Sequence, residues 1–126
     1  MPAAKYSFKV EQGATLTFNI EWRDNDNNPI DISGSYDSAK MQIRSDYADI
    51  NGNTLYATLT SSLSASPSVT GLFLSSSGTI NVFLSAETTE GFTFEEGLYD
   101  LELYKGGVVE RLLEGKVTVS KEVTRY

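Results

Sequence analysis

The feature that most constrains the fold is a pair of alternating segments at residues 97–120, GLYDLELYKGGVVERLLEGKVTVS. In the first segment Tyr99, Leu101 and Leu103 alternate with mostly polar side chains, which is the period of a half-buried strand. The glycine pair at 106–107 reaches positive φ without steric cost, so the chain can reverse there in a tight turn. Because the apolar face of a hairpin must pack on a second layer, the other segments are expected to supply partner strands.

The return segment of this hairpin, residues 108–120, keeps the same period, most cleanly in its second half. There Val117 and Val119 are expected to face inward, and Lys116 and Thr118 to face solvent. The full inward-facing set is expected to be Val109, Arg111, Leu113, Gly115, Val117 and Val119.

Further strands are expected upstream, and the clearest of them is Thr15–Arg23. Its apolar residues recur at every second position, at Leu16, Phe18, Ile20 and Trp22. The other expected strands are Tyr6–Val10, Ala39–Arg44, Thr54–Thr60 and Thr79–Leu84, with a short apolar patch at Gly71–Leu74. Their core-facing residues are expected to be Tyr6, Phe8, Val10, Ala39, Met41, Ile43, Leu55, Ala57, Leu59, Ile80, Val82 and Leu84. The outward positions of Ala39–Arg44 are basic, so this strand complements the acidic hairpin.

The segments between these strands are rich in turn-forming residues. Ser85, followed by Glu87, is suited to cap a single short helix at residues 86–90, which Gly91 would end. The remaining connections are expected to be an exposed turn at Asp24–Pro29, a loop at Ser33–Ser38, a reversal at Asn51-Gly52 and a serine-rich surface loop at Ser61–Thr70.

The spacing of these elements predicts the fold class. Seven or eight short strands follow one another at intervals of about ten to fifteen residues, with one helical turn and no long helical segment between strands. A parallel sheet needs such helical segments as crossovers. The sequence therefore predicts an all-β protein, a single antiparallel β-sandwich domain spanning residues 1–126.

The composition argues against several classes of function. The chain has no cysteine and no histidine, so disulfides, thiolate metal sites and histidine acid–base chemistry are excluded. A formal charge of −7 does not favour nucleic acid or anionic membrane as a partner, because both require a basic surface. Neither a signal peptide nor an apolar membrane span is evident, so synthesis and folding in the cytoplasm are expected. No cofactor and no small-molecule substrate are expected.

One turn has part of the pattern of a calcium loop. Asp24, Asp26 and Asn28 occupy its first, third and fifth positions. Pro29 stands at the sixth position, where glycine is needed, and Ser35 at the twelfth, where a bidentate glutamate is needed. An exposed turn without metal is the favoured interpretation.

The acidic residues of the hairpin offer the nearest approach to a catalytic pair. Asp100 and Glu102 share one face of a strand about 7 Å apart, a separation compatible with glycoside hydrolysis. Nothing in the sequence indicates a cleft around them, and a solvated charged face is the favoured interpretation. The serines have neither a histidine base nor a GxSxG motif, so we expect no enzyme activity.

Aromatic residues support a different class of function, a small carbohydrate-binding module in which exposed rings stack on sugars. The candidate rings are those of Trp22, Tyr6, Tyr36, Tyr47, Tyr56, Tyr99, Tyr104 and Tyr126. Most of them alternate with expected core positions, so packing accounts for them more simply than sugar binding does.

The order of motifs along nearly the whole chain resembles a recurrent small protein of tailed bacteriophages, similar to the N-terminal β-sandwich of phage upper baseplate proteins. The motifs that carry the resemblance are VEQGAT at 10–15, PIDISG at 29–34, MQIR at 41–44, LSAETT at 84–89, GLYDLEL at 97–103 and RLLEGKVTVS at 111–120. The closing motif is the most specific of them.

The resemblance implies a non-enzymatic structural component of the virion, a β-sandwich adaptor in the tail, baseplate or neck. Its partners would be other virion proteins and copies of itself, and its location the phage particle. Decoration of the capsid is the alternative position. Contacts with neighbours are expected through edge strands and through the two terminal segments, where the candidate interface residues are Pro2, Tyr6, Val123, Arg125 and Tyr126.

Overall fold

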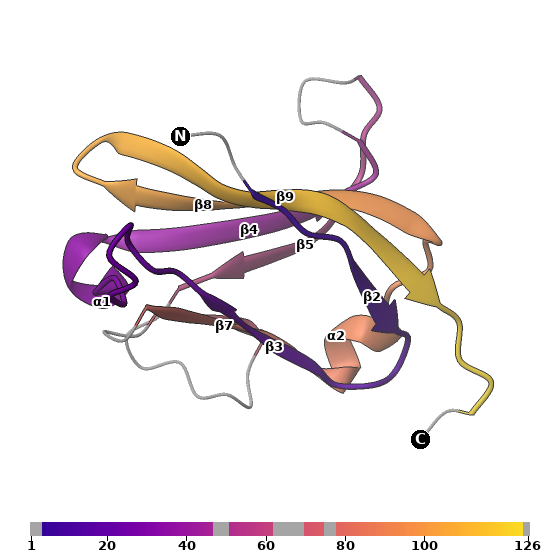
Figure 1. Ribbon diagram of the computed structural model, residues 1–126. Coiled ribbons are helices and arrows are strands. Elements are labelled where there is room, and N and C mark those ends of the chain that lie inside the picture. Colours follow the sequence, from indigo (N-terminus) through magenta and orange to yellow (C-terminus); the bar gives the residue numbers. More distant parts are fainter. Residues whose placement is uncertain (1–3, 47–50, 62–69, 75–77, 125–126) are drawn as a thin grey trace.

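The computed structural model describes residues 4–46, 51–61, 70–74 and 78–124, which form two packed sheets (Figure 1). The strands are β1 (Ala4–Lys5), β2 (Phe8–Glu11), β3 (Leu16–Glu21), β4 (Ser38–Arg44), β5 (Leu55–Thr60), β6 (Gly71–Leu74), β7 (Thr79–Leu84), β8 (Glu96–Lys105) and β9 (Val108–Ser120). The helices are α1 (Ile32–Ser35) and α2 (Ala86–Glu90). The predicted all-β sandwich is confirmed.

The larger sheet, called sheet A, has the order β1-β9-β8-β4-β5, and β2 also pairs with β9. The smaller sheet, called sheet B, has the order β3-β7-β6. In Figure 1 sheet A forms the upper layer, sheet B forms the lower layer, and α2 lies at one end between them. Both layers turn an apolar face inward, as a two-layer sandwich requires.

The β8–β9 hairpin is at the centre of sheet A, as the sequence predicts. Its turn is made by Gly106 and Gly107, which have φ of 56° and 88°. Leu101, Leu103 and Val117 are completely buried on its inner face.

The prediction is wrong for the first half of β9, because the register shifts at a bulge. Leu101 pairs with Leu113, but the next residue, Glu102, pairs with Arg111, so Leu112 is the extra residue. A bulge moves the residues before it to the opposite face. Arg111 and Val109 therefore lie on the outer face, and not on the inner face as predicted.

The N-terminal strands depart from the expected antiparallel pairing. β1 and β2 both run parallel to β9, with Phe8 opposite Val117. Between them, the Tyr6 carbonyl oxygen approaches Gly115 so closely that a Cβ at Gly115 would overlap it. Tyr6 is exposed and not part of the core as predicted, while Phe8 and Val10 are buried.

β3 has the predicted alternation, but its apolar side chains are only half-buried. The reason is its position at the edge of sheet B, where it pairs with β7 alone. In β5 a second register shift, at Ile43/Arg44 of its partner β4, leaves Leu55 exposed although the sequence places it in the core. Leu59 is buried as predicted.

One of the two helices, α2, is predicted from local sequence, and the other, α1, is not. α2 begins and ends where predicted, with the Ser85 hydroxyl accepting from the Thr88 N–H and Gly91 at its C-terminus. α1 is a single turn that begins at Ile32, one residue before the predicted loop at Ser33–Ser38, and takes up the first half of that loop. Asp31 caps it by accepting from the Gly34 N–H, which is the usual capping role of aspartate.

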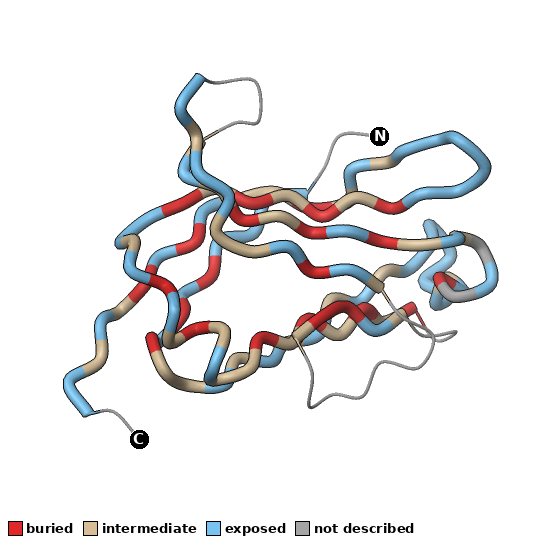
Figure 2. Tube along the Cα trace, turned by 180° about the vertical axis from the view of Figure 1, so that it is seen from behind, coloured by how far each residue is buried: buried red, intermediate tan, exposed pale blue. Residues whose placement is uncertain are grey.

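The core lies between the sheets and is shown in red in Figure 2. Its fully buried side chains are Val10, Ile32, Met41, Ile43, Leu59, Leu72, Ile80, Val82, Leu84, Leu101, Leu103 and Val117. The predicted surface loop at residues 61–70 lies mostly outside the described residues, as does Tyr47. None of the helices in the described part of the chain has the length and apolar character to cross a membrane.

Candidate docking surfaces

The predicted terminal interface is only partly within the described residues, because Pro2, Arg125 and Tyr126 lie outside them. Tyr6 is 47% exposed and its N–H donates to the Glu114 carbonyl oxygen. Val123 is completely exposed beyond the end of β9. The two described residues are thus separated by the second half of β9 and do not form one cluster.

A buried glutamine fixes the path of the C-terminal segment. The Gln12 amide Nε2 donates to the Phe92 carbonyl oxygen over 2.7 Å, and its Oε1 accepts from the Glu122 N–H over 3.1 Å. Gln12 therefore joins the end of β2, the connection after α2 and the segment that precedes Val123. Its role is not visible in the sequence, since an isolated glutamine in a turn is normally exposed.

The clearest exposed apolar surface is at the turn of the β8–β9 hairpin. This hairpin tip comprises residues 104–109, and Tyr104, Val108 and Val109 are 44%, 68% and 57% exposed. In Figure 2 it is the pale-blue loop at the upper right. The hairpin extends past its neighbour because β4 begins at Ser38, opposite Tyr104. The available signal in the sequence is that Val108 and Val109 follow directly after the glycine turn.

The hairpin tip is held in place by the segment after α1. The Asp37 N–H donates to the Tyr104 carbonyl oxygen over 2.8 Å, and the Asp37 carboxylate accepts from the Gly106 N–H over 3.0 Å. Next to it, the Tyr36 hydroxyl donates to Glu110 Oε2 over 2.6 Å. Burial and this contact with a carboxylate raise the pKa of Tyr36 to about 12. The apolar tip is thus presented on a fixed backbone.

A hollow of about 330 Å³ lies beside the hairpin tip on the outer face of sheet A. Polar and apolar residues of β4, β8, β9 and the end of β5 line it together: Ser38, Ala39, Lys40, Thr60, Ser61, Glu102, Leu103, Tyr104 and Val109.

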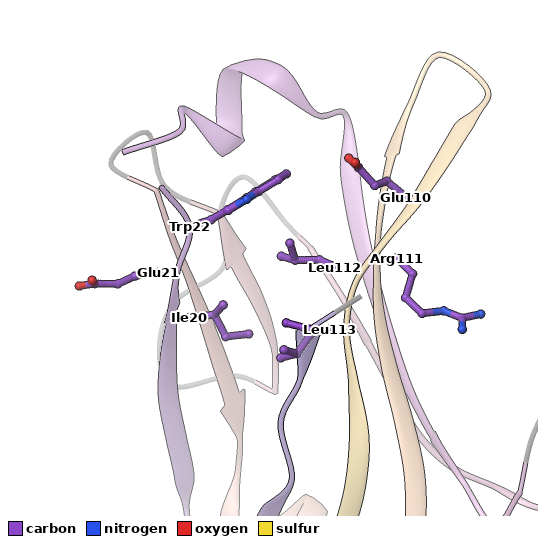
Figure 3. Close-up of a pocket in the computed structure, with 8 residues that line it drawn as sticks. Ile20, Glu21, Trp22, Glu110, Arg111, Leu112 and Leu113 are labelled. Atoms are coloured by element: carbon purple, nitrogen blue, oxygen red, sulfur yellow. The ribbon is translucent and has the colours of Figure 1, made fainter. Parts of the chain in front are cut away.

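A second, smaller pocket of about 170 Å³ opens between the edges of the two sheets. Figure 3 shows four apolar side chains directed into it: Ile20 of β3, Trp22 just after β3, and Leu112 and Leu113 of β9. The Trp22 ring stacks on that of Tyr36, with centroids 5.8 Å apart. The pocket is the physical reason why Trp22 is half-buried.

The carboxylates considered for catalysis belong to an ion-pair network centred on Arg111. Its Nε lies 3.5 Å from Asp100 Oδ2 and 3.9 Å from Glu102 Oε2, and its Nη1 lies 3.6 Å from Glu114 Oε2. Partial burial raises the pKa of Asp100; Arg111 counteracts this shift, and Glu114 adds to it. All these side chains are at least one-quarter exposed, so the network lies at the surface.

The turn with partial calcium-loop spacing is exposed, as predicted. Asp24 Oδ1 accepts from the N–H groups of Asp26 and Asn28, each over 2.9 Å. This is the way in which aspartate stabilises a turn. Among the described residues, no three acidic side chains are grouped closely enough to hold a metal ion.

Of the aromatic rings considered for sugar binding, the structure describes six, of which one is buried and three are half-buried. Tyr99 is buried, and its hydroxyl donates to the Tyr6 carbonyl oxygen. Tyr56 stacks on Phe94, with centroids 3.8 Å apart. Tyr6 and Tyr104 are the tyrosines in the described residues that are classed as exposed.

Comparisons with known proteins do not identify a family. Neither a protein-family model nor a curated protein matches the chain. One similar solved structure is a marsupial T cell receptor, with 11% identity and a TM-score of 0.47 over 94% of this chain and 51% of that chain. Another is the extracellular domain of the voltage-gated sodium channel beta4 subunit, with 7% identity and a TM-score of 0.45 over 98% of this chain and 97% of that chain. The chain thus spans about half the length of the first of these structures.

The strand order itself is that of an immunoglobulin-like sandwich. Strands β9, β8, β4 and β5 correspond in order to G, F, C and C′, and β3, β7 and β6 correspond to B, E and D. This correspondence concerns the fold alone, since sandwiches of this type serve many unrelated functions.

Proposed function

We propose that the protein is a structural component of a tailed bacteriophage particle, a β-sandwich adaptor that binds neighbouring virion proteins in the tail, baseplate or neck. The motif order described above supports the phage assignment. The observation that carries the docking role is the hairpin tip, where Tyr104, Val108 and Val109 expose apolar surface on a backbone fixed by Asp37.

Two properties of the hairpin tip favour binding: its exposed apolar side chains and its ordered backbone. Apolar side chains gathered at one exposed place favour binding, because burying them in an interface removes apolar area from water. A loop that is already ordered loses little conformational entropy on binding. The hydrogen bonds of Asp37 with Tyr104 at the end of β8 and with Gly106 in the turn supply that order before any partner arrives.

The experiment replaces Val108, which is exposed and contributes little to the core, with aspartate. Val108→Asp is expected to reduce incorporation into particles at least about tenfold while the melting temperature stays the same, since a charge cannot be buried in an apolar contact. Incorporation is measured by mass spectrometry of purified particles from cells that supply the variant.

The matched control is Thr15→Asp, which places the same charge at another exposed β-branched position, just before β3. It is expected to leave incorporation unchanged. Normal incorporation of Val108→Asp would contradict the docking role of the hairpin tip. Absence of the wild-type protein from purified particles would contradict the phage assignment.

A further inference from the structure

The outer face of sheet A differs in charge from the rest of the molecule. Six of the ten basic residues of the chain lie on it, as their pairing positions show: Lys5, Lys9, Lys40, Arg44, Arg111 and Lys116. Only five of the seventeen acidic residues do: Glu11, Glu96, Asp100, Glu102 and Glu114. This face is therefore close to neutral, and the net charge of −7 is carried elsewhere.

We infer that the outer face of sheet A binds a second copy of this chain, with β4 of each copy lying over β8 of the other. The inference rests on the proposed function, since the phage resemblance that supports it implies copies of the chain among the partners. Like net charges repel when two copies meet through most of the surface. The near-neutral face, with charges of both signs, is where this repulsion is weakest.

The arrangement of charges along the strands fixes the symmetry. On this face β4 carries Lys40 and Arg44, and β8 carries Glu96, Asp100 and Glu102. A two-fold axis between β4 and β8, parallel to the strands, places each basic strand over the acidic strand of the other copy. An axis perpendicular to the strands would place β8 over itself and oppose like charges. The interface is then isologous, so every contact occurs twice.

Lys40 and Glu102 form the central pair of this arrangement. They lie opposite each other in the β4–β8 register, so the axis that passes between them brings Lys40 of each copy over Glu102 of the other. Within the described residues the Lys40 ammonium forms no salt bridge, and the one salt bridge of Glu102 is the 3.9 Å contact with Arg111. Both charges are thus available for an intermolecular contact.

The shape of the face supports the same axis. Tyr104 lies opposite Ser38 in the register, so the axis places Tyr104 of one copy over Ser38 of the other. Ser38 lines the hollow of about 330 Å³ beside the hairpin tip. Tyr104 lines the same hollow, so the axis places the hollows of the two copies face to face, with the exposed Tyr104 side chain of each copy beside the hollow of the other.

The size of the face indicates a weak dimer. Four strands about 4.8 Å apart, each with some seven residues about 3.3 Å long, give a plane of roughly 400 Å². Stable complexes bury about 800 Å² on each partner. We expect a dissociation constant on the order of 10⁻⁴ M, which the high local concentration in an assembly would overcome.

The test uses charge reversal in the isolated full chain, measured by sedimentation equilibrium up to about 1 mM protein. Lys40→Glu and Glu102→Lys are each expected to weaken self-association at least about tenfold, because each opposes like charges across the axis. An equimolar mixture of the two variants is expected to associate at least as strongly as wild type, since every Lys40–Glu102 position then has opposite charges. Each variant also places like charges at positions 40 and 102 within its own chain, which disturbs the β4–β8 pair. Recovery of association in the mixture shows that the loss seen with each variant alone arises at the interface and not from misfolding.

Two controls match the change in net charge. Lys121→Glu and Glu87→Lys are exposed and lie off this face, so both are expected to associate like wild type. Tyr104→Ala is expected to weaken association at least about threefold through loss of an exposed aromatic side chain at the interface. A wild-type protein that stays monomeric at 1 mM, a mixture without recovery, or controls as disruptive as the face variants would overturn the inference. None of these results bears on the Val108→Asp experiment, which measures incorporation into particles and tests the hairpin tip separately.

Discussion

Tyr36 and Glu110 join the segment after α1 to the bulged half of β9 through a hydrogen bond of 2.6 Å. Glu110 lies opposite the buried Leu103, at a position where the bulge has turned it inward. The hydroxyl of Tyr36 therefore satisfies a carboxylate that the register shift would otherwise leave against the core. The bulge and this bond are two parts of one local arrangement next to the hairpin tip.

This pair predicts a dependence of stability on alkaline pH. The pKa of Tyr36 is near 10 in the unfolded chain and about 12 in the folded protein, because burial and Glu110 disfavour the phenolate. The stabilising contribution is complete below pH 10 and is lost as the pH rises through 12. Tyr36→Phe keeps the ring stacked on Trp22 but removes the hydroxyl that ionises. The unfolding free energy of this variant should therefore fall less steeply than that of wild type between pH 10 and 12. Urea unfolding at several pH values measures the two slopes, and identical slopes would refute the assignment.

A second prediction concerns Gly115, whose Cβ position is occupied by the Tyr6 carbonyl oxygen. Gly115→Ala should displace the N-terminal strands and destabilise the protein by about 1 to 3 kcal/mol. Hydrogen exchange of the β2 amides should accelerate most. Gly91→Ala is the control, because its Cβ would meet its nearest neighbour at 3.5 Å, an ordinary contact. Unchanged protection of β2 in Gly115→Ala would show that the close approach does not matter.

The core predicts graded losses on truncation to alanine. Leu101→Ala removes a fully buried side chain and should cost roughly 2 to 5 kcal/mol, and Leu113→Ala should cost a similar amount. Trp22→Ala should cost only about 2 to 3 kcal/mol, since the ring is half-buried beside a pocket. Denaturant titration gives the order, and a larger loss for Trp22→Ala than for Leu101→Ala would contradict it.

The Asp24 turn predicts tolerance of a change in charge. Asp24→Asn together with Asp26→Asn should leave the melting temperature and incorporation into particles nearly unchanged, because an asparagine oxygen can accept the same two N–H groups. Asp24→Ala removes that acceptor and should cost on the order of 1 kcal/mol. A calcium-dependent rise in the melting temperature of wild type, absent from the double variant, would show instead that the turn binds metal.

Deletion of the C-terminal segment is expected to affect assembly into particles but not folding. Deletion of residues 123–126 leaves Gln12 bonded to the Glu122 N–H, so the domain should keep its melting temperature. Incorporation into particles should be lost if this segment docks on a neighbour, as its fully exposed Val123 suggests. Particles that take up the truncated protein normally would remove this segment from the interface.

What the sequence predicts well is local. The alternation of β7 and the cap of α2 depend on neighbouring residues, and both elements have the predicted bounds. The register shifts at Leu101/Glu102 and Ile43/Arg44 depend on the partner strand. Alternation along one segment therefore predicts the wrong face for Val109, Arg111 and Leu55. The parallel pairing of β2 is likewise a property of two distant segments.

The candidate surfaces likewise depend on residues from several strands. Exposure of the hairpin tip depends on where β4 begins relative to β8, which alternation within one segment does not specify. The near-neutral face of sheet A emerges only when residues of β1, β2, β4, β8 and β9 are placed on one side of the sheet. The terminal interface was inferred from position along the chain, and it remains a prediction.

The measurement that tests the central claim most directly is a density map of the whole phage particle. We predict several symmetry-related copies of this sandwich in the tail, baseplate or neck, with Val108 and Val109 buried against a neighbouring protein. A particle without the protein, or copies whose hairpin tips all face solvent, would contradict the account.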